Sequence, residues 1–514
     1  MPVFVLSLLF GLVIIPNVLA GDSPAATHRP APCLYAQESG GSEGASEESW
    51  DYDEDWDVGS DFSIADEEPD FTWRVDVAFE NFIKTDRELH FEDAYKKQEV
   101  NARLDVKYGT SDKYLKSITD VYFFPTFLNE DVGDDYEYSR ESRTHRNLRI
   151  SSQSSEIIFR ELYYNWLFDK YRLRIGNQIY PWGTADFLNS TSYLNPNDLR
   201  ELILKDDDER RLGVPSVSAM MFFSDFTVEM VFVPCHTAVP LPSTDPVTDH
   251  FWAVDKVEDQ YPVYFDESDP MAANSENFGY AARISSTYRG MDFSVSGYHG
   301  PDNDQLLVPV QTVLEPNESV GIRVEPRYFV VDYMGADFSM TYEDFAFNAE
   351  AAYSPNKRAV IDQDTDHPQD LEFPYDTERA DYLSYSIGVN YFIPMHKLLP
   401  GHAGDSLFTM EWYQATYFDD KFEDPQLTDL LSLQFQDSYF DKRVKVWLAT
   451  VFETRDGGMI FWPKLGYDFK NGFEVEVGYV AINGQGEGDY DEDSLFYYYR
   501  DNDIVMVNFT YAFP

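Results

Sequence analysis

Residues 71–80 of the chain read FTWRVDVAFE, and this stretch decides the fold class because it alternates. Aromatic and branched apolar residues stand at the odd positions, and mostly polar or charged residues stand between them. Apolar residues at every second position predict a β-strand with one apolar face. Residues 100–108, VNARLDVKY, repeat the pattern with the opposite parity. We therefore expect strands from residue 71 onward, each with one apolar face that contacts lipid or a protein core.

The same alternation continues to the end of the chain, and it predicts eighteen strands, with sixteen as the alternative count. We expect them near residues 71–83, 98–108, 113–125, 156–167, 171–180, 214–223, 226–234, 277–288, 291–299, 327–342, 345–354, 380–393, 405–418, 428–438, 443–453, 458–468, 472–482 and 502–513. An even number of strands brings both ends of a closed barrel to the same side of a membrane.

The connections between these strands alternate in length. Tight hairpin turns, most with aromatic residues on both sides, are expected at residues 168–171, 223–226, 288–291, 342–345 and 469–473. Long polar loops are expected at residues 126–154, 181–213, 235–276, 300–326 and 355–379. Short periplasmic turns and long extracellular loops are typical of outer-membrane proteins. We therefore predict an all-β fold: one closed antiparallel transmembrane β-barrel over residues 71–514.

Composition agrees with a barrel and excludes other classes. Of the 514 residues, 16% are aromatic, yet the mean hydropathy is −0.43 because polar residues separate the rings. A net charge of −53 excludes a nucleic-acid-binding protein that works through phosphate contacts. The sequence has none of the Gly-x-Ser-x-Gly, His-Glu-x-x-His or Gly-x-Gly-x-x-Gly motifs. We therefore expect no enzyme activity, no cofactor and no metal site.

The first seventy residues read as an export signal and a tail. An apolar run over residues 3–15 and the small residues at 18–20 predict a signal peptide over residues 1–20 and Sec-dependent export; a membrane anchor is the alternative. Residues 21–70 are rich in acids and predict a disordered periplasmic tail. A docking peptide, with Trp50 and Trp56 as anchors for a periplasmic partner, is the alternative.

The last strand suggests where the protein goes. Residues 505–513, VMVNFTYAF, alternate and end on an aromatic residue, which resembles the signal that the outer-membrane barrel assembly machinery recognises. Pro514 follows that aromatic, and the last strand of a soluble sandwich is the alternative interpretation. We expect the Gram-negative outer membrane as the location, with membrane lipid and lipopolysaccharide as neighbours.

The parity of the strands predicts which side chains face the lumen. If the apolar face of each strand meets lipid, the predicted pore-lining residues are Arg74, Arg103, Lys107, Arg172, Arg174 and Gln178. Acids, including Glu229 and Glu350, should also face inward. Two interpretations stay open: the lumenal charges pair with one another, or the cations form a basic wall that guides carboxylates.

The loop over residues 181–212 is the predicted constriction. It is long, and residues 195–201 predict a capped helical turn inside it. Its candidate residues, expected beside the Arg172 and Arg174 wall, are Trp182, Asp186, Asp198, Arg200 and Glu201. Acids across from bases would orient a dipolar or anionic solute.

At this loop the sequence resembles a known family. Residues 174–183 (RIGNQIYPWG), 195–200 (NPNDLR) and 211–215 (RLGVP) are similar to a porin-like family of proteobacterial outer-membrane proteins, domain of unknown function 1302. The resemblance covers about residues 156–234. It implies a barrel in an envelope transport system, in some cases beside an exporter of lipid-like compounds.

These observations predict a porin-like channel, monomeric or homotrimeric, for small organic anions or amphiphilic solutes. A structural or surface-interaction barrel is one alternative, and an outer-membrane component of a lipid or hydrophobe transport system is another. An enzyme whose Ser, His and Asp come from distant strands is the least favoured interpretation.

The two cysteines provide a test of the predicted topology. Cys33 lies in the periplasmic tail and Cys235 follows a strand that runs outward, so the membrane should separate them. We expect both thiols to remain unpaired, and intact-mass analysis should find the fully reduced mass. A mass lower by two hydrogens would place the tail inside the pore.

Overall fold

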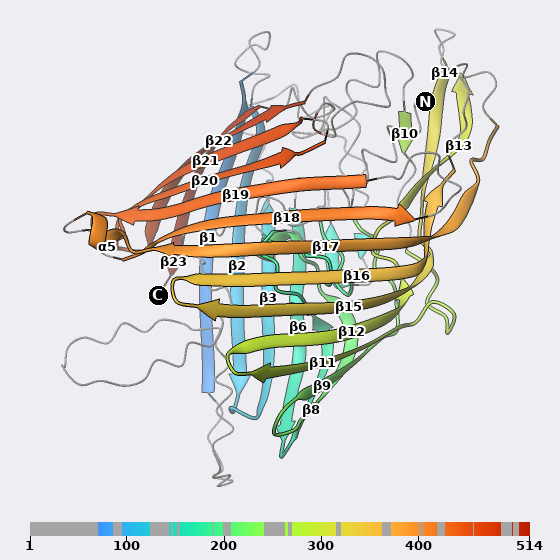
Figure 1. Ribbon diagram of the computed structural model, residues 1–514, viewed down its shortest axis with the longest axis horizontal. Helices are drawn as coiled ribbons and strands as arrows, with labels where there is room; N and C mark the ends of the chain where they lie inside the picture. The colour runs from blue at the N-terminus through green and yellow to red at the C-terminus, as the bar shows by residue number, and fades with distance from the viewer. Residues whose placement is uncertain are drawn as a thin grey trace.

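The computed structural model describes residues 70–85, 95–123, 143–144, 147–151, 155–187, 189–198, 207–240, 263–265, 270–314, 320–361, 372–399, 402, 404–418, 427–455, 457–484, 496 and 503–513. Eighteen of the strands in these ranges form one antiparallel barrel (Figure 1). They are β1 (Asp70–Lys84), β2 (Tyr95–Gly109), β3 (Lys113–Phe123), β6 (Ser155–Phe168), β7 (Tyr171–Gln178), β8 (Val214–Phe222), β9 (Thr227–Val233), β11 (Gly279–Tyr288), β12 (Met291–Pro301), β15 (Val330–Tyr342), β16 (Phe345–Val360), β17 (Thr377–Ile393), β18 (Ser406–Phe418), β19 (Leu427–Tyr439), β20 (Val444–Glu453), β21 (Met459–Asp468), β22 (Phe473–Asn483) and β23 (Ile504–Phe513).

The barrel closes where its first strand meets its last. β1 pairs with β2 on one side and with β23 on the other, in a register that runs from Val75 opposite Phe513 to Lys84 opposite Ile504. Each other strand pairs with the next in chain order. Closure removes free sheet edges, which is how strands can cross lipid with their backbone groups satisfied. The predicted barrel and its strand count are confirmed.

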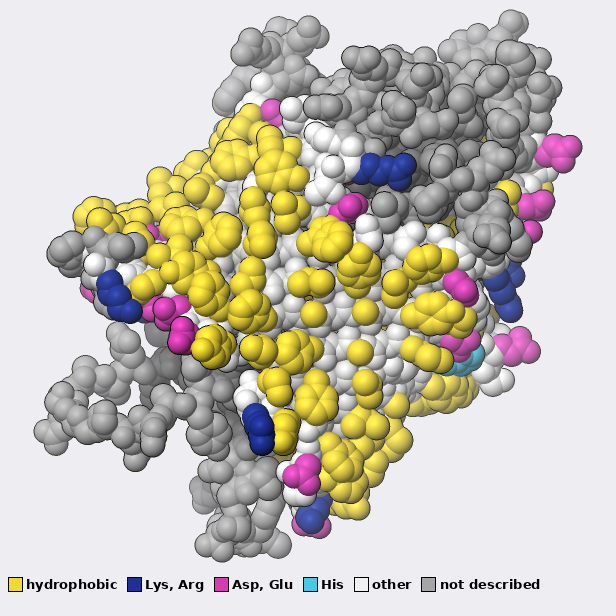
Figure 2. Space-filling view, viewed as in Figure 1, with side chains coloured by type: hydrophobic (Ala, Val, Ile, Leu, Met, Phe, Trp, Pro, Cys, Tyr) yellow, Lys and Arg dark blue, Asp and Glu magenta, His cyan; other side chains and the backbone are white. Residues whose placement is uncertain are grey.

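Alternating side chains separate the two faces of the wall. Phe71 and Trp73 on β1 are about half exposed, at 57% and 49%, whereas buried polar residues such as Asn101 on β2 lie on the opposite face. Figure 2 shows hydrophobic side chains over most of the visible outer wall, with charged ones mainly near its edges. The parity used to predict lumen-facing residues therefore holds for these strands.

Tight turns gather at one end of the barrel, which we call the short-turn end. At the predicted hairpins, Asp169, Arg289, Glu343 and Lys470 take left-handed φ values of 50° to 58°. Such values suit the two-residue turns at Asp169, Arg289 and Glu343, because the twist of these turns matches that of the flanking strands. The connection from β17 to β18 is longer and holds the one-turn helix α5 (Met395–Leu398). The opposite end carries the longer connections and is called the long-loop end.

Two of the predicted loops contain more strand than expected. Within residues 300–326, β13 (Leu306–Leu314) and β14 (Val320–Arg327) form a hairpin that β10 (Val263–Phe265) joins as a parallel strand. Within residues 355–379, β16 continues to Val360 and β17 begins at Thr377. Val308, Val360 and Tyr375 share one buried cluster, so packing between the hairpin and the extended strands explains both differences.

Smaller elements complete the described part of the chain. β4 (Arg143–Thr144) and β5 (Arg149–Ser151) extend the sheet beside β6, and α4 (Asp207–Arg210) precedes β8. None of the helices in these ranges has the length and apolar character needed to cross a membrane. The predicted signal peptide, almost all of the predicted acidic tail, and Cys33 lie outside the described residues.

Barrel closure predicts a change of gel mobility on heating. Eighteen strands joined in a closed sheet should resist sodium dodecyl sulfate until heated, because the sheet has no free edge from which pairing is lost. Unheated and boiled samples of membrane extract should therefore migrate differently. Equal migration of the two samples, with the protein recovered in the soluble fraction, would contradict the barrel.

Candidate functional site

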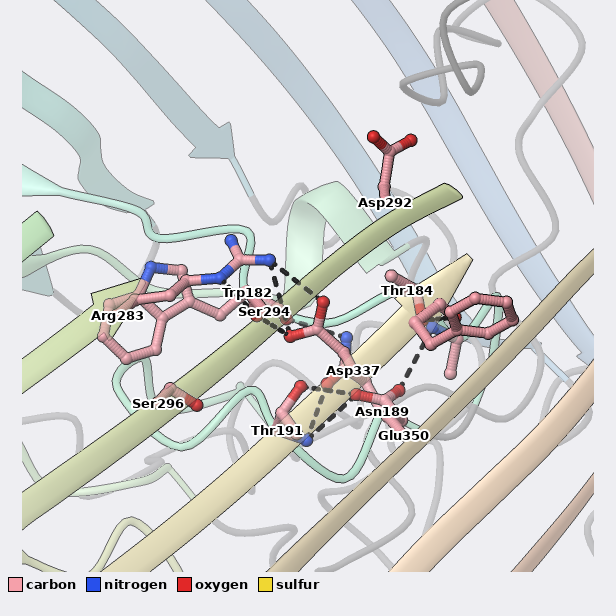
Figure 3. Close-up of polar contacts among 12 residues, drawn as sticks. Trp182, Thr184, Asn189, Thr191, Arg283, Asp292, Ser294, Ser296, Asp337 and Glu350 are labelled. Carbon is pink, nitrogen blue, oxygen red and sulfur yellow. Dashed lines mark hydrogen bonds and ion pairs between the residues drawn. The ribbon is translucent and has the colours of Figure 1, made fainter. Parts of the chain in front are cut away.

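The connection from β7 to β8, residues 179–213, folds into the barrel; its described residues are called the inner loop. Its contacts reach strands far from its own ends, from β9 around the wall to β18. Figure 3 shows Trp182, Thr184, Asn189 and Thr191 of the inner loop beside Asp337 and Glu350 of the wall.

Glu350 of β16 is the first acceptor for the inner loop. Its Oε1 accepts from the backbone N–H of Ala185 at 3.1 Å, and its Oε2 accepts from that of Thr191 at 3.1 Å. The hydroxyl of Thr191 also donates to Oε2. The carboxylate is 3% exposed, and charge-assisted bonds of this kind are about twice as strong as neutral ones. Glu350 therefore holds two separate points of the loop on β16.

Glu411 of β18 is the second acceptor. Its Oε2 accepts from the N–H of Asp186 at 2.8 Å, and the N–H of Phe187 lies 3.3 Å from both oxygens. The Asp186 carboxylate in turn accepts from the side-chain amide of Asn390 on β17 at 2.5 Å. Glu411 and Phe187 are fully buried. Glu411 thus holds the tip of the inner loop through the backbone N–H groups of the loop.

The third acceptor, Glu229 of β9, binds a side chain instead of the backbone. The Trp182 indole N–H donates to Glu229 at 3.0 Å, and the Arg283 guanidinium lies 6.0 Å from the Trp182 ring centre. Arg283 also contacts the Asp337 carboxylate at 3.2 Å, as Figure 3 shows. This group fixes the first turn of the loop on β9, β11 and β15.

Aromatic packing covers the middle of the loop. The Tyr193 ring stacks on Tyr333 with centres 5.2 Å apart, and its edge-on neighbour Trp182 lies at 6.0 Å. The Tyr193 hydroxyl hydrogen-bonds Ser296 of β12. Burial raises the pKa of Tyr193 to about 12, so this phenol is harder to ionise than an exposed one. The loop is therefore packed against the wall and not only hydrogen-bonded to it.

The absence of a side chain at Gly335 lets the inner loop pack closely against β15. A Cβ at Gly335 of β15 would lie 3.0 Å from the Thr191 methyl and 3.2 Å from the Tyr193 hydroxyl. Gly183 has φ 102°, and a Cβ there would collide with Asn189 at 2.1 Å. Glycine is needed at Gly183 because the left-handed backbone and the close approach both exclude a side chain.

The base of the loop is tied to β3 and β6. Arg160 stands at an irregularity in the pairing of β3 with β6, where an extra residue changes the direction of its side chain. It donates to the backbone oxygen of Arg211 at 3.0 Å and to the Tyr122 hydroxyl at 3.0 Å, and it pairs with Asp120. This buried network joins the returning end of the loop to the wall.

The predicted helical turn at residues 195–201 is wrong for the part that the structure describes. Asn197 pairs with Arg211 in an isolated bridge, and Pro196 accepts a hydrogen bond from the N–H of Leu212. Asn195 donates to the backbone oxygens of Gln178 and Leu212, which closes the neck of the loop. The two ends of the loop therefore pair with each other, and this pairing replaces a helix.

The six predicted pore-lining residues fall into different surroundings. Arg74 pairs with Asp76 at 2.9 Å, and Arg103 pairs with Asp120 at 2.9 Å. Gln178 is buried and binds Ser216 and Ser218 of β8, at the neck of the loop. The other three are close to aromatic rings: Lys107 to Tyr114, Arg172 to Phe222 and Arg174 to Tyr163.

The predicted loop residues are also dispersed. Trp182 contacts Glu229 of β9. Asp186 packs against β17 and β18, where Asn390 and Glu411 bind it, and not beside Arg172 and Arg174 of β7. Asp198 is fully buried at the neck, where its N–H donates to the backbone of Arg210. Arg200 and Glu201 lie outside the described residues.

Residues that hold the inner loop but were not among the candidates from sequence include Arg160 and Glu411. Glu411 follows the inward parity of its strand and could have been found by it. Arg160 could not be found by extending the parity of residues 161–167, since the inward positions of β6 change from odd to even residues at the irregular pairing.

An antiparallel barrel of eighteen strands, with a loop folded into its lumen, has a porin-like architecture. The family model described as protein of unknown function DUF1302 matches residues 48–513, and the chain belongs to this family. The resemblance predicted from residues 156–234 is therefore confirmed over most of the chain. No curated protein matches the sequence.

Solved outer-membrane proteins resemble the structure at low identity. OccK9 (OpdG) from Pseudomonas aeruginosa has 8% identity and a TM-score of 0.45, with 87% of this chain and 98% of that chain covered. OccAB3 from Acinetobacter baumannii has 8% identity and a TM-score of 0.45, covering 86% and 99%. The trimer form of OmpT from Vibrio cholerae has 9% identity and a TM-score of 0.39, covering 87% and 100%. These values do not identify a substrate.

The contact at Gly335 predicts a specific disulfide. Since a Cβ at Gly335 would lie 3.0 Å from the Thr191 methyl carbon, Cβ atoms at the two positions come within about 4.5 Å, in disulfide range. The variant T191C/G335C, made in a C33S/C235S background, should form this bond in oxidised membranes. Mass spectrometry of the linked peptides measures it.

The control places the second cysteine at Met334, which is 63% exposed on the outer face of the same strand. T191C/M334C should remain reduced. Equal bond formation in both variants, or none in either, would mean that the loop does not lie on the inner face of β15.

Proposed function

We propose that the protein is a porin-like channel of the Gram-negative outer membrane in which the inner loop narrows the lumen. The observation that carries this proposal is the binding of the loop's backbone by Glu350 and Glu411 on β16 and β18, far from the strands that the loop connects. An element fixed across a barrel reduces the opening of a lumen that, with eighteen strands, would otherwise be wide. The proposed path runs along β19–β23, beside the bound loop.

Small organic anions and amphiphilic solutes are the proposed cargo. Lys107, Arg172 and Arg174 face the lumen beside uncharged rings, which suits an anion. A basic wall opposite a loop fixed by acids also creates a field across the opening.

Several other features belong to this proposal. Residues 1–20 act as the export signal, residues 21–70 form a periplasmic tail that either solvates the barrel mouth or docks on a periplasmic partner, and β23 provides the assembly signal. The barrel works as a monomer or a homotrimer, without enzymatic activity or a cofactor.

Removing the inner loop should open the channel. Deletion of residues 186–208 takes away the segment bound by Glu350 and Glu411, so single-channel conductance in planar bilayers should rise roughly twofold or more, since the open cross-section grows. A folded deletion variant with unchanged conductance would contradict the constriction.

A double substitution tests the constriction without removing any residues, so it does not depend on the folding of the deletion variant. E350Q/E411Q keeps the shape of both acceptors but removes the charges that hold the loop, which should give larger or noisier conductance steps. The matched control is the oxidised T191C/G335C variant, whose loop is bound in its native place. Its conductance should equal that of the wild type.

A further inference from the structure

Pro463 stands in the middle of β21 and interrupts the pairing of this strand with β22. The two strands pair on both sides of it, at residues 459–461 and 464–468 of β21, but Trp462 and Pro463 have no partner on β22. The register is the same before and after the interruption, so no residue is inserted and this is not a β-bulge. On its other side, β21 pairs with β20 without a break.

The chemistry of proline explains the interruption. In an antiparallel sheet, the N–H and C=O of one residue point to the same neighbouring strand, and successive residues alternate between the two neighbours. Because the break falls on the side of β22, the Pro463 nitrogen faces Tyr479, and it has no hydrogen to donate to the Tyr479 carbonyl. Proline is normally confined to edge strands and bulges, so its place inside a closed barrel needs a reason.

Apolar residues surround the interruption on the outer wall. Phe461, Leu465 and Val477 are 38%, 55% and 46% exposed there, which places Pro463 at the depth of the hydrocarbon layer. No water is available at this depth to replace the missing donor, so a lost backbone hydrogen bond costs more than it does in a soluble protein. The pairing of β21 with β22 is therefore weakened where the barrel contacts lipid.

Trp462 covers the interruption from the lumen. Its side chain is buried on the inner face of β21, and a Cβ at Gly478 of β22 would lie 3.5 Å from its indole nitrogen. The ring therefore reaches from β21 to β22 beside the skipped pairs. Trp447 of β20 packs edge-on against it with ring centres 5.2 Å apart, and the Lys464 ammonium lies 4.4 Å from its ring centre.

The indole N–H of Trp462 is a second anomaly at the same place. The side chain is fully buried, and its N–H has no hydrogen-bond partner among the residues that the structure describes. A buried tryptophan N–H usually has an acceptor. Packing alone therefore keeps the indole over the interruption, and the ring loses no hydrogen bond when it turns away.

We propose that β21 and β22 part at Pro463, and that this lateral opening lets a single-chain amphiphile pass between the lumen and the membrane, with Trp462 as the side chain that closes it. The inference rests on the proposed channel function, because the amphiphile reaches the opening through the lumen. It adds an exit through the wall to the path along the barrel.

The size of the interruption favours a solute with one acyl chain. Two skipped pairs correspond to roughly 7 Å along the strands, so a slim chain fits better than a lipid with two chains. Once the strands part, the Trp447 and Trp462 rings offer the chain an apolar surface on the lumenal side, and Leu465 and Val477 offer one on the lipid side.

A thiol reagent dissolved in lipid tests the opening. G478C, made in a C33S/C235S background, places a thiol on the lumenal side of the interruption, where a Cβ has no contact shorter than 3.4 Å. The purified full-length protein in liposomes should react there with N-dodecylmaleimide. P463V/G478C supplies the missing N–H and should slow the reaction roughly tenfold, as expected for one hydrogen bond. W462A/G478C should react faster, because the closing side chain is gone.

The matched control is A352C. Ala352 is a buried residue of the inner face of β16, but the pairing on both sides of it is continuous. Its reaction should be slow, and P463V should not change it. The heat-shifted gel band checks that each variant is folded, and W462A decides the test if P463V fails to fold. Equal rates for G478C and A352C, or a G478C rate that neither substitution changes, would overturn the lateral opening.

Conductance separates this inference from the proposed function. P463V should conduct ions like the wild type, because the path along the barrel does not cross the wall. Conduction without reaction at G478C would overturn the lateral opening and leave the channel intact. Reaction at G478C that depends on Pro463, without any conduction, would overturn the channel and leave the opening as a route into a closed barrel.

Discussion

Backbone N–H groups that cross the inside of a barrel need acceptors, and in this protein the carboxylates of wall strands supply them. Glu350 and Glu411 are buried, and a buried carboxylate is costly unless it is hydrogen-bonded. The inner loop satisfies them, and they in turn satisfy the loop. This mutual dependence fixes where the loop lies inside the barrel.

Much of the barrel could be predicted because the information for each strand is local. Alternation along a strand such as residues 71–80 depends on one physical rule, that one face meets lipid and the other meets the lumen. The interpretation that lumenal charges pair with one another describes part of the molecule, and the basic wall that guides carboxylates stays a prediction. Arg103, Lys445 and Lys464 pair with carboxylates at 2.9, 2.7 and 3.6 Å, whereas Arg172 and Arg174 contact rings.

The destination of the inner loop could not be predicted, because it depends on groups distant in sequence. Asp186 and Glu411 are 225 residues apart, and only the closed barrel brings them together. Arg160 owes its direction to an irregular pairing at which the inward positions of β6 change from even to odd residues. The hairpin of β13 and β14 was expected to be a loop because its stabilising partners, Val360 and Tyr375, lie on another connection.

The central claim is that small solutes pass through the barrel beside the bound inner loop. Swelling of liposomes that contain the purified wild-type protein, measured in small uncharged solutes of increasing size, tests it most directly. The account predicts that these liposomes swell faster than protein-free ones and that the rate falls as the solute grows. Swelling at the protein-free rate for every solute, with the heat-shifted gel band showing a folded barrel, would contradict it.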